Sequence, residues 1–69
     1  MDLDEYNNKM KIINERINQI SELTAKMALI GQAEHSNPQF VILMEAFENL
    51  ILEADKLIKS MTESIKNKT

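Results

Sequence analysis

The sequence predicts an all-α protein, one domain over residues 1–69 in which two long antiparallel helices form a helical hairpin. Three observations support this prediction. Hydrophobic residues make up 43% of the chain but aromatic residues only 4%, a balance typical of helix bundles rather than β-sandwiches or barrels. The chain holds one Gly and one Pro, so few positions interrupt a helix. Two long series of apolar residues recur at intervals of three and four, the repeat of one helix face.

The first helix is expected over about residues 3–33. Asp2 can cap its N-terminus, with Glu5 three residues later as in a capping box. Met1 and Tyr6 can form a hydrophobic staple across the same end. The positions expected to face the second helix are Leu3, Tyr6, Met10, Ile13, Ile17, Ile20, Thr24 and Met27.

The end of this helix has two possible positions. Gly31 is the C′ residue in the first, because glycine adopts the left-handed conformation that often follows a helix. In the second, the helix continues to about residue 34 and tolerates Gly31 inside it. The boundary at about residue 33 follows the second alternative.

Residues 34–37 are expected to form the turn, and residues 38–66 the second helix. A residue before Pro avoids the α conformation, so Asn37 is a good N-cap and Pro38 a good first helical residue. Each helix then has about 28 residues and a length of roughly 42 Å, and the short connection favours antiparallel packing. The positions expected to face the first helix are Phe40, Met44, Phe47, Ile51, Ala54, Ile58, Met61 and Ile65.

The second helix carries a further row of leucines that a pair of helices does not need. Together the two rows span roughly 140° of its surface, wider than one partner helix covers. Contiguous exposed apolar surface on a small protein usually marks an interface, although scattered surface aliphatic residues are also common. We therefore expect a four-helix bundle, made by two hairpins or by a hairpin and helices of another protein. The extra row is Leu43, Leu50 and Leu57, the similar flank of the first helix is Ile12, Leu23 and Ile30, and the expected partner-binding residues are Phe40, Leu43, Phe47, Leu50, Ile51 and Leu57.

Chain length and residue types also indicate a need for a partner. A chain this short removes a small fraction of its surface from water, so natural examples add disulfides, a structural metal or another subunit. No Cys and one His exclude a disulfide and a closed zinc site, which needs four N or S ligands. We expect no metal and no cofactor, and association as a homodimer or with a helical protein partner.

Charge and hydropathy restrict the partner and the location. The net charge of −3 disfavours nonspecific binding to nucleic acid or to an anionic membrane, which needs clustered Lys and Arg. No apolar run approaches the roughly 18 residues of a membrane span, and the acidic start is the reverse of a secretory n-region. Because the absence of Cys fits a reducing compartment, we expect a cytoplasmic protein.

No group of residues has the spacing of a catalytic site, and we expect a protein that is not an enzyme. His35 lies in the turn, without the Ser, Cys or Asp spacing of a triad or a metal site. Glu45, Glu48 and Asp55 are candidates for paired carboxylates, but a general acid needs a buried environment and these are expected on a polar face. Three i,i+4 ion pairs are expected to support the helices: Glu5–Lys9, Glu22–Lys26 and Asp55–Lys59.

The turn and the second helix carry the pattern of a known family. Asn37-Pro38-Gln39-Phe40 places an aromatic residue soon after the turn, and the later positions are aliphatic, Ala and paired aliphatic: Ile51, Ala54, Leu57 and Ile58. In this stretch the chain resembles small type III secretion needle-subunit co-chaperones, which are helical hairpins of similar length. The resemblance implies a cytoplasmic adaptor that pairs with a larger helical chaperone and keeps a needle subunit soluble.

A second resemblance is to the small hairpin phosphatases of the sporulation phosphorelay, which also place Pro at the turn. Their signature Ser-Gln-Glu-Leu-Asp is absent, since the corresponding stretch reads Met44-Glu45-Ala46-Phe47-Glu48, and no phosphatase role is carried over. The sequence therefore predicts a protein–protein interaction module, an adaptor or chaperone-like protein. The alternatives are a small regulatory protein that binds a response regulator or another signalling protein, and an RNA-binding hairpin dimer.

Overall fold

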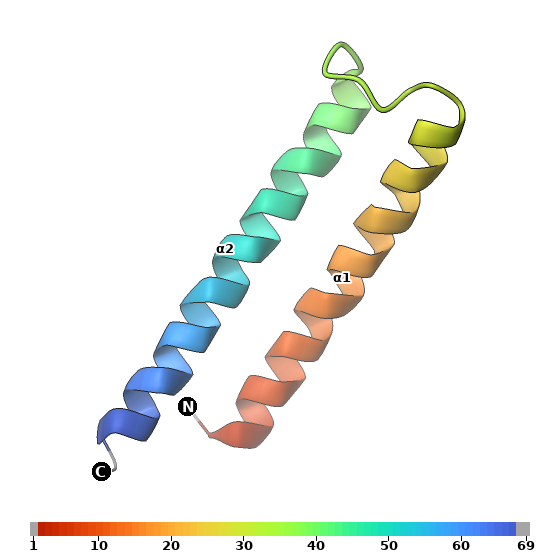
Figure 1. The fold of residues 1–69 in the computed structure, drawn as a ribbon. Helices are drawn as coiled ribbons and strands as arrows, with labels where there is room; N and C mark the ends of the chain where they lie inside the picture. Colours follow the sequence, from red (N-terminus) through yellow and green to blue (C-terminus); the bar gives the residue numbers. More distant parts are fainter. Residues whose placement is uncertain (1, 68–69) are drawn as a thin grey trace.

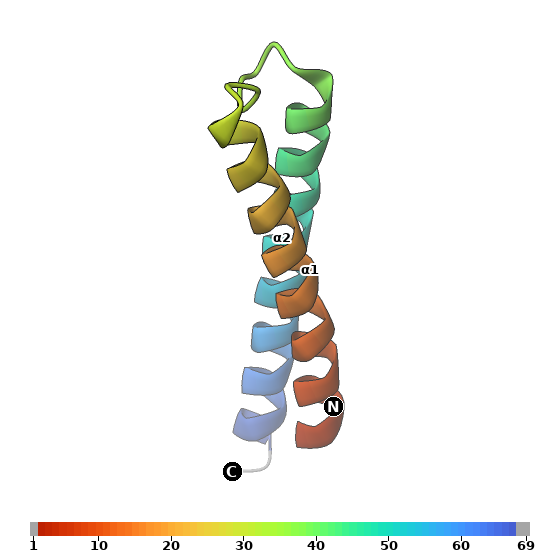
Figure 2. The same ribbon diagram turned by 90° about the vertical axis from the view of Figure 1, so that its right-hand side faces the viewer.

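The fold is an antiparallel pair of long helices, as the sequence predicts. The computed structural model describes residues 2–67, in which α1 spans Leu3–Leu29 and α2 spans Pro38–Asn67. The two helices lie side by side, with the connection at one end and the start of α1 and the end of α2 at the other (Figure 1). Seen from the side of α1, that helix crosses in front of α2 at a small angle (Figure 2). The molecule measures 52 × 18 × 12 Å, which is the shape of one helix pair without a third layer.

Asp2 caps the start of α1, which confirms the expected N-cap. Its backbone is extended, and its Oδ1 accepts a hydrogen bond of 2.7 Å from the backbone N–H of Glu5. The carboxylate of Glu5 lies 3.1 Å from Lys9 Nζ, so this side chain supports the first turns as an ion pair. The expected contact of Met1 with Tyr6 lies outside the described residues.

Gly31 ends α1, and the predicted boundary at about residue 33 is wrong. Gly31 has a φ of 72°, its N–H donates to the carbonyl of Ala28 at 3.1 Å, and the N–H of Gln32 donates to the carbonyl of Met27 at 2.7 Å. These two bonds form a Schellman motif, which satisfies carbonyls at the helix end and turns the chain away. The first alternative, with Gly31 as the C′ residue, is therefore the observed one, and α1 ends at Leu29.

Asn37 caps α2 and also ties the connection together. Its Oδ1 accepts from the backbone N–H of Gln39 at 2.9 Å and from that of Phe40 at 3.5 Å. Its Nδ2 donates to Gln32 Oε1 at 2.9 Å, which joins Gln32, three residues after the end of α1, to the residue before α2. The predicted roles of Asn37 as N-cap and of Pro38 as first helical residue are confirmed.

The core is a narrow line of apolar side chains between the helices. Ile13, Leu50 and Leu57 are the buried residues, each 7–8% exposed. The side chains packed against them are partly buried: Tyr6, Met10, Ile17, Ile20 and Ala54. The predicted inner face of α1 is confirmed from Tyr6 to Met27, whereas Leu3 is 59% exposed and does not belong to it.

The predicted inner face of α2 is in part reversed. Leu43, Leu50 and Leu57, named here the leucine row, face α1, although they were expected to be surplus. Ile51, Ile58 and Ile65, named here the isoleucine row, were expected to face α1 and are exposed. The reason is geometric: both rows complete an unbroken three-and-four series with Phe40, Phe47, Ala54 and Met61, so spacing alone does not decide which row faces α1.

Candidate interaction surfaces

The isoleucine row is the longest exposed apolar feature of α2. Ile51 and Ile58 are each 47% exposed and Ile65 is 58% exposed. The three lie seven residues apart, so they share one side of the helix over roughly 21 Å. Met44, one heptad before Ile51, extends the same side and is partly buried. An aligned series of large aliphatic side chains in water is the kind of surface that marks an interface.

The isoleucine row lies between the core and a charged edge of α2. Ile51 follows Leu50 by one residue and is therefore rotated about 100° from the direction of α1. Beyond the row lies Asp55, whose carboxylate is 2.9 Å from Lys59 Nζ in one of the expected i,i+4 ion pairs. Thr62 lies on this edge as well, and its hydroxyl donates to the carbonyl of Ile58 at 2.8 Å. An apolar row beside polar residues has the layout of an interface core with its rim.

The opposite edge of the hairpin carries a second apolar surface, near the connection. Ile42 precedes the leucine row by one residue, whereas Ile51 follows it, so the two lie on opposite sides of the core. Ile42 is 63% exposed and, with Leu23, Met27, Gln39 and Leu43, lines an open groove between the helices. We name this surface the loop-end groove.

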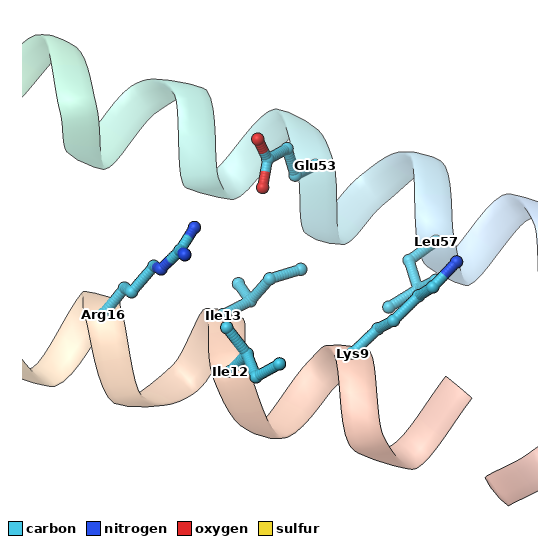
Figure 3. Close-up of a pocket in the computed structure, with 6 residues that line it drawn as sticks. All are labelled: Lys9, Ile12, Ile13, Arg16, Glu53 and Leu57. Carbon is cyan, nitrogen blue, oxygen red and sulfur yellow. The ribbon is translucent and has the colours of Figure 1, made fainter. Parts of the chain in front are cut away.

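Further from the connection, the same edge becomes charged. Figure 3 shows Arg16 extending from α1 toward α2 and Glu53 lying along α2, with the side chains of Ile13 and Leu57 between the two helices. Lys9 and Ile12 complete this groove, and Arg16 also lines the next one along, beside Ile20 and Leu50. Arg16 and Glu53 therefore lie between the apolar loop-end groove and the end of the hairpin where α1 begins.

The six residues predicted to bind a partner fall into three groups. Leu50 and Leu57 are core residues, so their predicted place on a free surface is wrong. Three others are partly buried: Phe40, Leu43 and Phe47. Ile51 alone among the six lies in the isoleucine row, and the sequence reasoning missed Ile42, Ile58 and Ile65 as surface residues.

The residues considered for chemistry lie apart on the surface. His35 is exposed in the connection, and its ring meets Phe40 edge-on at 6.1 Å between ring centres. Glu45, Glu48 and Asp55 are exposed, as expected. Among residues 2–67, no group of three His, Asp or Glu side chains is placed to hold a metal ion. Over the same residues, no helix has the length and apolar character needed to cross a bilayer.

The fold and these surfaces define a two-helix hairpin with an exposed aliphatic row on its second helix. No protein-family model, no curated protein and no solved structure matches the chain. The resemblances to needle-subunit co-chaperones and to hairpin phosphatases therefore stay predictions from the sequence.

Proposed function

We propose that this hairpin is a non-enzymatic protein–protein interaction module, a small cytoplasmic adaptor or chaperone-like protein whose isoleucine row binds a helical surface. The observation that carries the proposal is the roughly half exposure of Ile51 and Ile58 and the greater exposure of Ile65 on one side of α2. A helix with such a stripe is completed by another helix that packs an apolar face against it.

The size of this surface suits a partner that is helical and apolar. Burying an isoleucine fully contributes about 1.5–3 kcal/mol, so a half-exposed one gains about 1 kcal/mol on binding. Three such residues and their counterparts on the partner contribute roughly 6 kcal/mol, which lies at the low end of the 4–15 kcal/mol cost of association. A partner helix must therefore match the row along its length and add contacts at Met44 and at the rim.

The thin core gives binding a second effect, on the stability of the hairpin itself. Only Ile13, Leu50 and Leu57 are buried among residues 2–66, for which burial is described, so the isolated pair has little apolar area removed from water. A partner that binds the folded hairpin stabilises it, by about 2.7 kcal/mol when its concentration is 100 times the dissociation constant. Folding and binding are thereby coupled.

A photoreactive residue placed at Ile58, with a matched control at Leu52, tests the proposal in the cell. Leu52 is 57% exposed but lies about 100° beyond the isoleucine row, on the side of α2 away from α1. We expect covalent adducts from position 58 that map to one helical segment of a defined protein, and few from position 52. Equal adducts from both positions, or none from position 58 together with a helical monomer in light scattering, would contradict the proposal.

The same adducts separate the adaptor from the alternatives predicted from the sequence. An adduct with a secretion component or another chaperone supports the adaptor function. An adduct between position 58 and a response regulator supports the regulatory alternative instead, and adducts with RNA support the nucleic-acid alternative.

A further inference from the structure

The charges along α2 are unevenly distributed between its two halves. Residues 38–53 carry three Glu and no Lys or Arg, a net charge of −3. Residues 54–67 carry three Lys, one Asp and one Glu, a net charge of +1. Such a helix is complementary to its own copy when the two run antiparallel, and repels it when they run parallel.

The exposed area of the hairpin is also larger than that of a compact monomer. The chain has an accessible surface of 5412 Å² at a mass of 8.0 kDa. A compact folded protein of this mass exposes about 4,450 Å². The excess of about 1,000 Å² is close to the roughly 800 Å² that each partner contributes to a standard interface. A contact of standard size along the elongated hairpin would remove an area comparable to this excess.

The row itself has a centre about which it can pair with a copy. Met44, Ile51, Ile58 and Ile65 are evenly spaced, and the midpoint of this series lies between Ile51 and Ile58. A two-fold axis at this midpoint sets Ile51 of one copy beside Ile58 of the other, and Met44 beside Ile65. Asp55 lies close to this axis, and its carboxylate is paired with Lys59 of its own chain at 2.9 Å.

We propose that the occupant of the isoleucine row is a second copy of this chain, bound by antiparallel pairing of the two α2 helices about a two-fold axis between Ile51 and Ile58. This inference rests on the proposed function and adds its partner, its register and its direction. The loop-end groove stays outside the contact, since it lies on the opposite edge of the hairpin.

Cysteine cross-linking tests the register, and the chain offers a clean background because its sequence contains no Cys. In the proposed dimer, residues that face each other across the helix pair have Cα atoms about 4–6 Å apart, which suits a disulfide. The two copies of residue 51 are also offset from each other by about 10 Å along the helix axis, which is too far for a disulfide. The same distance prevents a disulfide between positions 51 and 58 within one chain.

We therefore expect the double variant Ile51→Cys/Ile58→Cys to form a disulfide-linked dimer under mild oxidation, and each single variant to form none. Apposed thiols have an effective concentration in the millimolar range, so at roughly 10 μM protein the double variant should react about 100-fold faster than the control Leu52→Cys. Circular dichroism of the reduced variants checks that each one is folded.

Three other outcomes overturn the inference. Rapid formation of a disulfide-linked dimer by the single variant Ile51→Cys means that the two α2 helices pair in parallel. Equal rates for the double variant and for Leu52→Cys mean random collision. A helical monomer in light scattering over a range of protein concentrations means that no second copy binds the isoleucine row. The proposed function survives this last result if the photoreactive residue at position 58 reaches a helix of another protein, so the two failures are distinguishable.

Discussion

Leu50 and Ile51 are neighbours in sequence with different surroundings, and their replacement by alanine gives the sharpest test of the hairpin core. Leu50 is 7% exposed between the helices, whereas Ile51 is 47% exposed in the isoleucine row. Leu50→Ala removes three carbon atoms from a packed site, at about 0.8 kcal/mol each before the cavity is counted. We expect a loss of about 2.5–3.5 kcal/mol, at the lower part of the usual range because the open edges of a helix pair can partly relax.

A loss of this size is large for so small a protein. At 0.05–0.15 kcal/mol per residue, a chain of 69 residues has an unfolding free energy of about 3–10 kcal/mol. Leu50→Ala therefore removes about a quarter or more of it, and Leu50→Glu, which also buries a charge, should abolish the helical signal. Ile51→Ala should cost less than about 1 kcal/mol in the monomer.

Urea denaturation followed by circular dichroism at 222 nm measures both variants. The series is repeated at several protein concentrations, because a change that acts through association depends on concentration and a change in the core does not. Equal unfolding midpoints for Leu50→Ala and Ile51→Ala at low concentration would refute the assignment of the leucine row to the core. A lower unfolding midpoint for Ile51→Ala than for Leu50→Ala would mean that the isoleucine row, and not the leucine row, faces α1.

Three further changes test the helix ends and the surface charges. Asn37→Ala removes the acceptor for the N–H of Gln39 at 2.9 Å, and should lower the unfolding free energy by about 1–2 kcal/mol in the same assay. Gly31→Ala should cost about 1 kcal/mol because φ is 72°, although an added Cβ meets no atom within 4 Å; a variant as stable as wild type would contradict the left-handed end of α1. Lys59→Ala removes the exposed ion pair with Asp55 and should cost a few tenths of a kcal/mol in dilute buffer and nothing in 1 M NaCl, so a cost independent of salt would point to another role.

The sequence predicted well those features that depend on neighbouring residues. The two caps at Asp2 and Asn37, the turn at Pro38 and the all-α hairpin are each determined by a few adjacent residues and by the repeat of three and four. Two of the three expected ion pairs, those at Lys9 and Lys59, are also present. The sequence offers Gly31 as a possible end of α1, but a glycine can also be tolerated inside a helix. The hydrogen bonds to the carbonyls of Met27 and Ala28 show which of the two positions the helix end takes.

The rotation of α2 about its own axis was not predictable from the repeat. Leu50 and Ile51 belong to rows with the same spacing and similar hydrophobicity, so exchanging them turns the helix without changing the pattern. Only contacts with α1, where Leu50 and Leu57 pack with Ile13, choose between the rows. The predicted binding surface inherited this ambiguity, and for that reason it contained two core residues and missed Ile58 and Ile65.

The start of α1 and the end of α2 both lie opposite the connection, and this placement determines how the hairpin responds to force (Figure 1). We expect a load applied through Leu3 and Asn67 to separate the helices from that end. Contacts then break one after another, beginning near Tyr6 and moving toward the connection, so only a few contacts bear the load at any time. A load along the length of α2 alone would instead have to slide every row past its neighbour at once. The hairpin is therefore mechanically weak when pulled from its two ends and stronger when one helix is pulled along its axis against the other.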